Sequence, residues 1–169
     1  MINHTRLDPD TGAATALPPR PNPDWWVAKL WHDTMGDDVL DIRALDGGDE
    51  HLQTYAHSGR RFASAASLGA TLLLINTSPS DSFEPSLPVF EDAVMGHGLV
   101  WPRVEYVLTA PGGDLSSDVL LLNGEPLVWD PNDPGRLPAG RLVNSSSAPP
   151  LTVPPHSIVF VELPTAVVY

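Results

Sequence analysis

The sequence predicts a mainly β fold that is preceded by one amphipathic helix. The 19 prolines and 13 glycines divide the 169 residues into short segments, which is typical of strands joined by tight turns. Most of these segments alternate apolar and polar side chains or are wholly apolar, as strands do. One segment near the N-terminus has helical spacing instead. The length suffices for one domain with a hydrophobic core, but a complete (β/α)8 barrel needs roughly 200 residues or more.

The helix is expected from about Pro23 to Met35. Asn22 can cap it, and a proline suits the first helical position. Gly36 is expected to end it. Apolar side chains form a wide stripe that needs a large surface to pack against. Its two adjacent rows are Trp26, Leu30 and Thr34, and Val27, Trp31 and Met35.

Seven strands follow the helix in this prediction. The segment 70–76 is a continuous apolar run, which is typical of a central strand covered on both faces. Asn123-Gly124 is the dipeptide favoured at the tip of a type I′ hairpin. Residues 1–21 are expected to form a loop, and 78–97 an irregular excursion. Strands at this turn-punctuated spacing indicate a β-sandwich or barrel. The expected strands are 39–45, 51–57, 70–76, 103–109, 119–122, 125–129 and 157–163.

Composition excludes several classes of function. The net charge of -12 repels nucleic acids and anionic membrane surfaces, and argues against this chain alone holding a polyanionic polysaccharide. No apolar run reaches the roughly 18 residues of a transmembrane span. The chain has no cysteine, which excludes disulfides, thiolate chemistry and cysteine zinc sites.

Several blocks of sequence resemble the heparanase-like glycosidases, glycoside hydrolase family 79, and above all their plant-type members. Pro-Asp-Trp-Trp at 23–26, Leu-Trp-His at 30–32 and Met-Gly at 35–36 are similar to that family's final barrel helix. The most specific block spans 105–110, 113–115 and 121–124. The segments 55–57, 72–76 and 157–161 are also similar, and all of the blocks occur in the family's order.

The resemblance implies a (β/α)8 barrel followed by a C-terminal β-sandwich. Residues 1–36 would then be the last loop and helix of the barrel, and 37–169 the accessory β-sandwich. The implied function is the C-terminal part of a heparanase or β-glucuronidase type hydrolase with a retaining two-glutamate mechanism, this piece packing against the barrel. Its partners would be that barrel and, through the parent enzyme, a carbohydrate. The alternative is a stand-alone, non-catalytic interaction or carbohydrate-binding module.

The family's two catalytic glutamates belong to earlier barrel strands, and no residue here matches either one. The acidic pairs at 37–38, 49–50 and 91–92 are expected to be solvated turn carboxylates. Neighbouring side chains also project in different directions, whereas a retaining pair needs carboxyls about 5–5.5 Å apart. No catalytic residue, cofactor site or metal site is therefore predicted. Where family members commonly carry a cysteine, this chain has Ser58.

A few residues remain candidates for contacts or modification. Sequons at Asn3, Asn76 and Asn144 hint at a secretory protein. The resemblance implies a secreted, cell-wall, lysosomal or vacuolar, or membrane-associated location. Trp101 and Trp129 are candidates for a sugar or interdomain contact.

Two further expectations concern histidine and tryptophan side chains. His51 and His57 are expected on one face of a strand as surface or half-buried residues, since a metal site needs further ligands. Without a barrel, the face formed by Trp26, Leu30 and Trp31 should be exposed, unless the helix packs on the β-domain itself.

Overall fold

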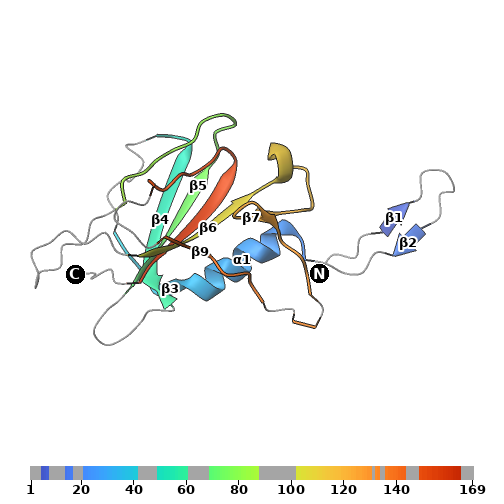
Figure 1. Cartoon of the computed structure of the whole chain (residues 1–169), viewed down its shortest axis with the longest axis horizontal. Helices are drawn as coiled ribbons and strands as arrows, with labels where there is room; N and C mark the ends of the chain where they lie inside the picture. Colours follow the sequence, from blue (N-terminus) through green and yellow to red (C-terminus); the bar gives the residue numbers. More distant parts are fainter. Residues whose placement is uncertain are drawn as a thin grey trace, which may run out of the picture.

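The computed structural model describes residues 5–7, 14–16, 21–41, 49–60, 69–87, 102–130, 132–133, 136–143 and 149–164. These residues form one eight-stranded antiparallel sheet, a separate two-stranded sheet and one α-helix (Figure 1). The predicted mainly β class is confirmed, and the arrangement is consistent with a β-sandwich preceded by a helix. No helix among the described residues is long and apolar enough to cross a bilayer.

The large sheet runs in the order β3-β4-β5-β10-β6-β7-β8, and β9 pairs with β6 beside β7. The last strand of this sheet in the sequence, β10, therefore lies at its centre. The bounds are β3 Met35–Val39, β4 Leu52–Gly59, β5 Ala70–Asn76, β6 Arg103–Thr109, β7 Leu121–Leu122, β8 Glu125–Pro126, β9 Arg141–Val143 and β10 Ser157–Leu163.

The three central strands form where the sequence predicts them. The observed bounds of β5, β6 and β10 equal the expected ones. Val159 of β10 lies opposite Leu74 of β5 on one side and Val107 of β6 on the other. β5 and β10 are covered on both faces and are mostly apolar, whereas β6 alternates and includes Arg103 and Glu105.

Helix α1 (Pro23–Thr34) lies across one face of this sheet (Figure 1). Leu30, with none of its surface exposed, packs in a cluster with Leu73 and Phe160 of the sheet. The Thr71 hydroxyl of β5 donates to the Thr34 carbonyl at 2.9 Å, which ties the end of the helix to the sheet. Trp26 and Leu30 are buried, and Leu30 packs on the sheet, so the second of the two expected outcomes is observed for Leu30: the helix packs on the β-domain itself.

The transition from helix to sheet is shorter than the sequence predicts. Helix α1 ends at Thr34, and Met35 is already extended (φ -83°, ψ 127°), so the prediction that Gly36 ends the helix is wrong. Gly36 lies in β3, where an added Cβ would come within 2.5 Å of the Ser58 carbonyl oxygen. A glycine is needed here because the two backbones approach closely. The strand expected at 39–45 lies at Met35–Val39 instead, and 42–48 fall outside the described residues.

The turns are partly as predicted. Asn123 and Gly124 both have positive φ (52° and 88°), which confirms the type I′ tip between β7 and β8. The flanking strands are shorter than expected, because each keeps only two ladder residues. Within 1–21, predicted as a loop, β1 (Thr5–Leu7) pairs with β2 (Ala14–Ala16). The irregular excursion is observed over 78–87, apart from one bridge at Phe83.

Candidate functional surfaces

Two glutamates are buried in the described core, and they lie on opposite faces of the sheet. Glu105 of β6 is opposite Val161, whereas Glu162 of β10 is opposite Val104, so the two are offset by one residue. Successive side chains of a strand point to opposite faces, and directly paired residues share a face. The two carboxylates are therefore separated by the sheet itself. They cannot flank one glycosidic bond as a retaining pair does.

Glu105 is held by two arginines on the face away from α1. Arg103 Nε donates to Oε1 at 2.6 Å, and Arg141 Nε donates to Oε2 at 3.0 Å. Arg103 also donates to the Pro149 carbonyl at 2.7 Å. A buried carboxylate requires such partners, because taking its charge out of water is costly. This ion-pair cluster explains Glu105 as a structural residue. The sequence analysis did not predict this cluster, although the spacing of Arg103 and Glu105, two apart on one strand and therefore on one face, indicates it.

Glu162 lies on the helix side of the sheet. The Tyr106 hydroxyl donates to Glu162 Oε2 at 2.9 Å, and both residues are buried. Their strands are adjacent, and Tyr106 is directly opposite Phe160, two residues before Glu162. This diagonal contact places a carboxylate inside an otherwise apolar layer and satisfies the tyrosine hydroxyl there.

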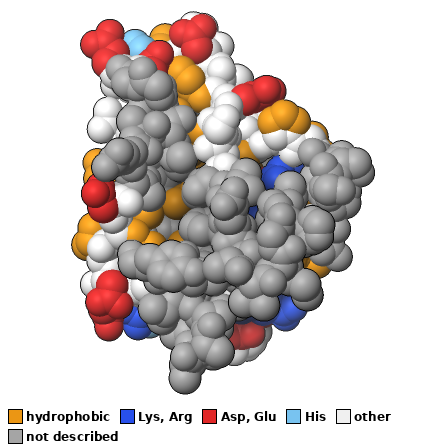
Figure 2. Space-filling model, turned by 90° about the vertical axis from the view of Figure 1, so that its left-hand side faces the viewer, with side chains coloured by type: hydrophobic (Ala, Val, Ile, Leu, Met, Phe, Trp, Pro, Cys, Tyr) orange, Lys and Arg blue, Asp and Glu red, His pale blue; other side chains and the backbone are white. Residues whose placement is uncertain are grey.

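The acidic pairs are at the surface wherever the structure describes them. Asp37 and Asp38 are exposed in β3, and Arg60 pairs with Asp37 at 2.9 Å. Asp49 and Glu50 are exposed just before β4. Glu91 and Asp92 lie outside the described residues. Figure 2 shows acidic side chains at several points around the rim of one side of the molecule, as a net charge of -12 leads one to expect.

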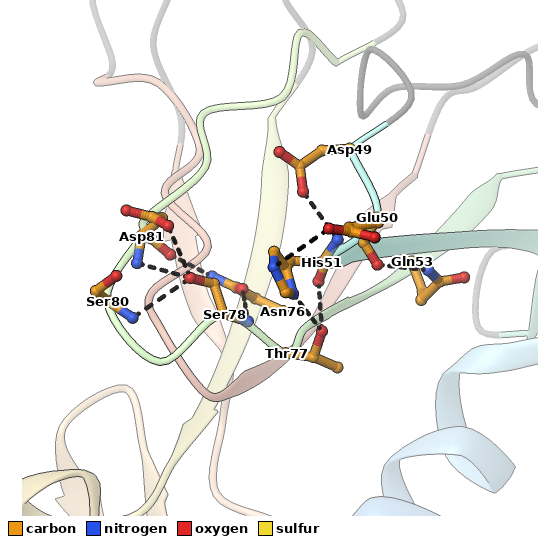
Figure 3. A network of polar contacts seen from close by, with 9 residues as sticks. All are labelled: Asp49, Glu50, His51, Gln53, Asn76, Thr77, Ser78, Ser80 and Asp81. Carbon is orange, nitrogen blue, oxygen red and sulfur yellow. Dashed lines mark hydrogen bonds and ion pairs between the residues drawn. The ribbon is translucent and has the colours of Figure 1, made fainter.

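The two histidines contact different parts of the chain. His51 lies in the turn before β4, where its Nδ1 is 3.4 Å from the Thr77 hydroxyl (Figure 3). His57 lies within β4, and its Nδ1 is 2.9 Å from the Gly36 carbonyl oxygen. Within the described parts of the chain, no three His, Asp or Glu side chains gather in a group able to hold a metal ion.

Asn76 is the centre of a buried polar network (Figure 3). Its Nδ2 donates to the carbonyls of Asp81, Val153 and Pro154 at 2.7, 3.1 and 2.8 Å. Its Oδ1 accepts from the Ser78 amide at 2.8 Å. A glycan would be attached to this nitrogen, which is fully engaged in a side chain that is 2% exposed.

We therefore expect Asn76 to be unmodified in the folded chain, and any glycan to lie on Asn3 or Asn144. Both of those asparagines fall outside the described residues.

Trp129, a candidate for a sugar contact, packs against the helix. Its ring meets that of Trp25 edge to face at 5.4 Å, and Trp25 meets Trp26 edge to face at 4.9 Å. Trp129 is half-buried as a result. Such edge-to-face contacts add about 0.5–1.5 kcal/mol each to the burial of the rings. Trp101 lies outside the described residues.

An aromatic surface remains exposed where α1 meets the edge of the sheet. Trp31 and Tyr55 are 41% and 47% exposed. A groove of about 460 Å³ lies beside Tyr55, and its lining includes Val39, Asp41 and His57. The sequence analysis named Trp31, Tyr55 and His57 in separate motifs. It did not predict that Trp31 and His57 are in contact, because only the pairing of β3 with β4 brings His57 to the end of the helix.

A smaller pocket of about 190 Å³ lies at the first turn of α1. The ends of β6 and β10 close it, and its lining is mostly apolar. Asp24, Val27, Leu108 and Ile158 are among the lining residues.

Comparison with known proteins places the chain among larger glycosidases. It is 32% identical to heparanase-like protein 2 of Arabidopsis thaliana over 86% of its length, and 33% identical to heparanase-like protein 1 of the same plant over 85%. It is 35% identical to the baicalin-β-D-glucuronidase of Scutellaria baicalensis, again over 85%. No family model matches the chain.

The chain spans only 30%, 29% and 24% of the lengths of these three relatives, in the order just given. All three relatives share this level of identity over most of the chain, and they are named as heparanase-like proteins or as a glucuronidase. The chain therefore belongs to the heparanase-like glycoside hydrolase family, and it matches a C-terminal portion of the family's larger members.

Proposed function

We propose that this chain is the C-terminal part of a retaining glycosidase that acts on β-glucuronosyl or related bonds. Residues 1–36 are the last loop and helix of the catalytic barrel, and 37–169 are the accessory β-domain. Its own role is to pack against the barrel and stabilise it. The two catalytic glutamates are supplied by the barrel.

The similarity to larger glycosidases is the observation that carries this proposal. A chain that matches 24–30% of each relative has the size of an accessory domain rather than of a barrel. One of these relatives is named as a glucuronidase, which supports a glucuronide as the substrate class.

The described carboxylates support a non-catalytic role for this portion. Glu105 is occupied by Arg103 and Arg141, and Glu162 lies across the sheet from it. A general acid and a nucleophile must both reach the sugar from one cleft. Neither buried glutamate reaches solvent, since both are at most 1% exposed.

Hydrolysis of an aryl β-glucuronide tests the proposal. The natural protein, read from its own coding sequence and purified whole, should release the aryl group, whereas the 169-residue chain should not. Substituting the two barrel glutamates with glutamine should abolish the release, with the fold checked by circular dichroism. A natural protein without a barrel, or hydrolysis by the 169-residue chain, would contradict the proposal.

The alternative of a stand-alone carbohydrate-binding module has its own test in the same preparation. If it holds, the 169-residue chain should bind glucuronide-containing glycans at equilibrium, and Trp129→Ala should weaken that binding. The edge-to-face contact of Trp129 with Trp25 favours a packing role for this ring instead.

A further inference from the structure

The side chain of Asn123 takes the place of a short piece of strand in the large sheet. Asn123 lies at the tip of the hairpin formed by β7 and β8, where its backbone has a positive φ of 52°. Strand β6 pairs with β9 over residues 103–105 and with β7 over residues 108–109. Between these two pairings, the backbone of β6 bonds to Asn123.

Three hydrogen bonds join Asn123 to this stretch of β6. Its backbone amide donates to the Val107 carbonyl at 2.8 Å, and the Val107 amide donates to Asn123 Oδ1 at 3.0 Å. Asn123 Nδ2 donates to the Glu105 carbonyl at 3.1 Å. One carboxamide therefore supplies both an acceptor and a donor to β6, as the peptide groups of a neighbouring strand would.

Asn123 is also the asparagine whose side-chain amide is chemically the most labile. It is the only one of the six asparagines that is followed by glycine. Glycine has no Cβ to shield its amide nitrogen, and Gly124 is exposed to water and hydroxide. In contrast, Asn22 is followed by Pro23, which has no amide hydrogen to lose.

Deamidation of an asparagine before a glycine proceeds through a cyclic imide. A base removes the Gly124 amide proton, and the Gly124 nitrogen bonds to Asn123 Cγ. The Cγ–Nδ2 bond breaks, and ammonia leaves with that proton. Water then adds to an imide carbonyl and breaks its carbon–nitrogen bond. Attack at the side-chain carbonyl gives aspartate, and attack at the backbone carbonyl gives isoaspartate.

The closed hairpin opposes the first of these steps. The carboxamide is held to β6 through both Oδ1 and Nδ2, and Nδ2 is the leaving group. The preceding residue, Leu122, is 3% exposed and belongs to the same core cluster as Leu30. We propose that Asn123 is a deamidation site controlled by the fold, stable while the β7–β8 hairpin is closed and reactive when it opens. This inference does not depend on the proposed function.

The reaction should make the opening permanent. A carboxylate has only acceptors, so it cannot donate to the Glu105 carbonyl, and its charge would lie against that oxygen. An isoaspartate would also lengthen the backbone of the turn by one carbon. A molecule that has reacted at Asn123 is therefore left without the side-chain bond that joins its hairpin to Glu105.

The rate of deamidation in the folded protein tests the proposal. The natural protein, purified whole, is incubated at mildly alkaline pH, and mass spectrometry of its peptides follows the conversion of Asn123. A synthetic peptide of residues 121–128 gives the rate without a fold. The folded protein should react at least about tenfold more slowly than the peptide, because three hydrogen bonds of ordinary strength hold the hairpin closed.

In urea that unfolds the protein, the rates of protein and peptide should agree. Equal rates without urea would overturn the proposal, and so would a slow reaction that persists after unfolding.

Loosening the hairpin gives an independent readout. Leu122→Ala removes the buried anchor beside Asn123 and should raise the rate in the folded protein, whereas Val128→Ala, at a position that is 77% exposed, should leave it unchanged. Each rate is compared with that of a peptide carrying the same substitution. Circular dichroism checks the fold, and Leu122→Val replaces Leu122→Ala if the latter does not fold. Acceleration by both substitutions, or by neither, would contradict control by the hairpin.

The effect of the product is measured with Asn123→Asp. This variant should lower the melting temperature more than Asn132→Asp, which makes the same change of charge at an exposed residue. Equal shifts would show that charge alone is responsible, against a role for the donor lost at Asn123.

Discussion

The two faces of the central sheet are covered in different ways. On one face, a single helix lays Leu30 over Leu73 and Phe160 in a largely apolar layer. On the other face, two irregular segments meet at the bridge between Phe83 and Val153 and cover the cluster around Leu74 and Val159. The helix satisfies its own backbone, but the irregular segments need partners for theirs.

Asn76 and Glu105 provide many of the hydrogen bonds that the backbone of the irregular segments needs. The Asn76 amide binds carbonyls from both segments, and Glu105 orients Arg103 toward the Pro149 carbonyl. One face of the sheet therefore depends on apolar packing, and the other also depends on a few buried polar groups. The substitutions below test this difference, from the largest expected effect to the smallest.

Removing the buried carboxylate should cause the largest loss. Glu105→Ala leaves the Arg103 guanidinium, whose side chain is 8% exposed, without its ion-pair partner. Breaking a buried pair in this way costs about 3–5 kcal/mol. Urea denaturation measures the free energy of unfolding.

Arg141→Ala is the comparison variant and should cost less than Glu105→Ala, because the Arg141 side chain is 60% exposed and Glu105 keeps its bond from Arg103. Equal losses for Glu105→Ala and Arg141→Ala would contradict the view that burial makes this pair important.

Truncating one leucine on each face compares the two cores directly. Leu30 and Leu74 are both fully buried, so Leu30→Ala and Leu74→Ala should each cost about 2–5 kcal/mol. Both variants should unfold in a single transition, because the helix and the sheet share a core. The measurement is thermal unfolding followed by near- and far-ultraviolet circular dichroism. If Leu30→Ala melts the helix and leaves the sheet's transition unchanged, the helix and the sheet unfold independently on either side of Gly36, against this expectation.

Truncating Asn76 should loosen only the irregular face. Asn76→Ala leaves three carbonyl oxygens without their common donor, and a cost of about 1–3 kcal/mol is expected. Hydrogen exchange should speed up at the Phe83 and Val153 amides, which bond each other's carbonyls, but not in α1. Thr77→Ala is the control, since Thr77 is exposed. Faster exchange in α1 would show that the two faces are coupled.

Asp114 lies in an exposed turn outside both faces and should have the smallest effect. Hydrogen bonds from the Ser116 hydroxyl and then the Ser116 amide lower the pKa of its carboxyl below the usual value. A lowered pKa means that the turn is stabilised above the unfolded pKa and loses this as pH falls through the folded one. The Ser116 amide resonance should therefore shift in acid, and Asp114→Asn should remove the shift. A shift that survives this substitution would assign it to another group.

Hydrophobic patterning predicted the central part of the fold well. The apolar segments of β5 and β10 are buried on both faces, and β6 alternates as predicted, so local pattern and final structure agree. The start of α1 at Pro23 also followed from the sequence, because proline suits only the first turn of a helix.

Predictions failed where contacts distant in sequence decide the structure. Gly36 was predicted to end the helix. A glycine is needed there for another reason, because the backbone of Ser58, 22 residues further along the chain, approaches it closely. The contact between the Trp31 and His57 rings likewise depends on the pairing of β3 with β4, in which Val39 lies opposite His57. Local periodicity contains no information about such pairings, so the sequence did not predict the contact between Trp31 and His57.

The ends of the large sheet have a consequence for the solubility of this chain. Its strand order begins with β3, where Asp37 and Asp38 are exposed, and ends with β8, which consists of Glu125 and Pro126. An unpaired edge is a template for adding strands from other molecules, but charged side chains oppose this and proline has no amide hydrogen to offer. Among the described strands, both ends of the sheet therefore oppose the addition of further strands, which limits growth into a fibril at the concentrations reached during purification.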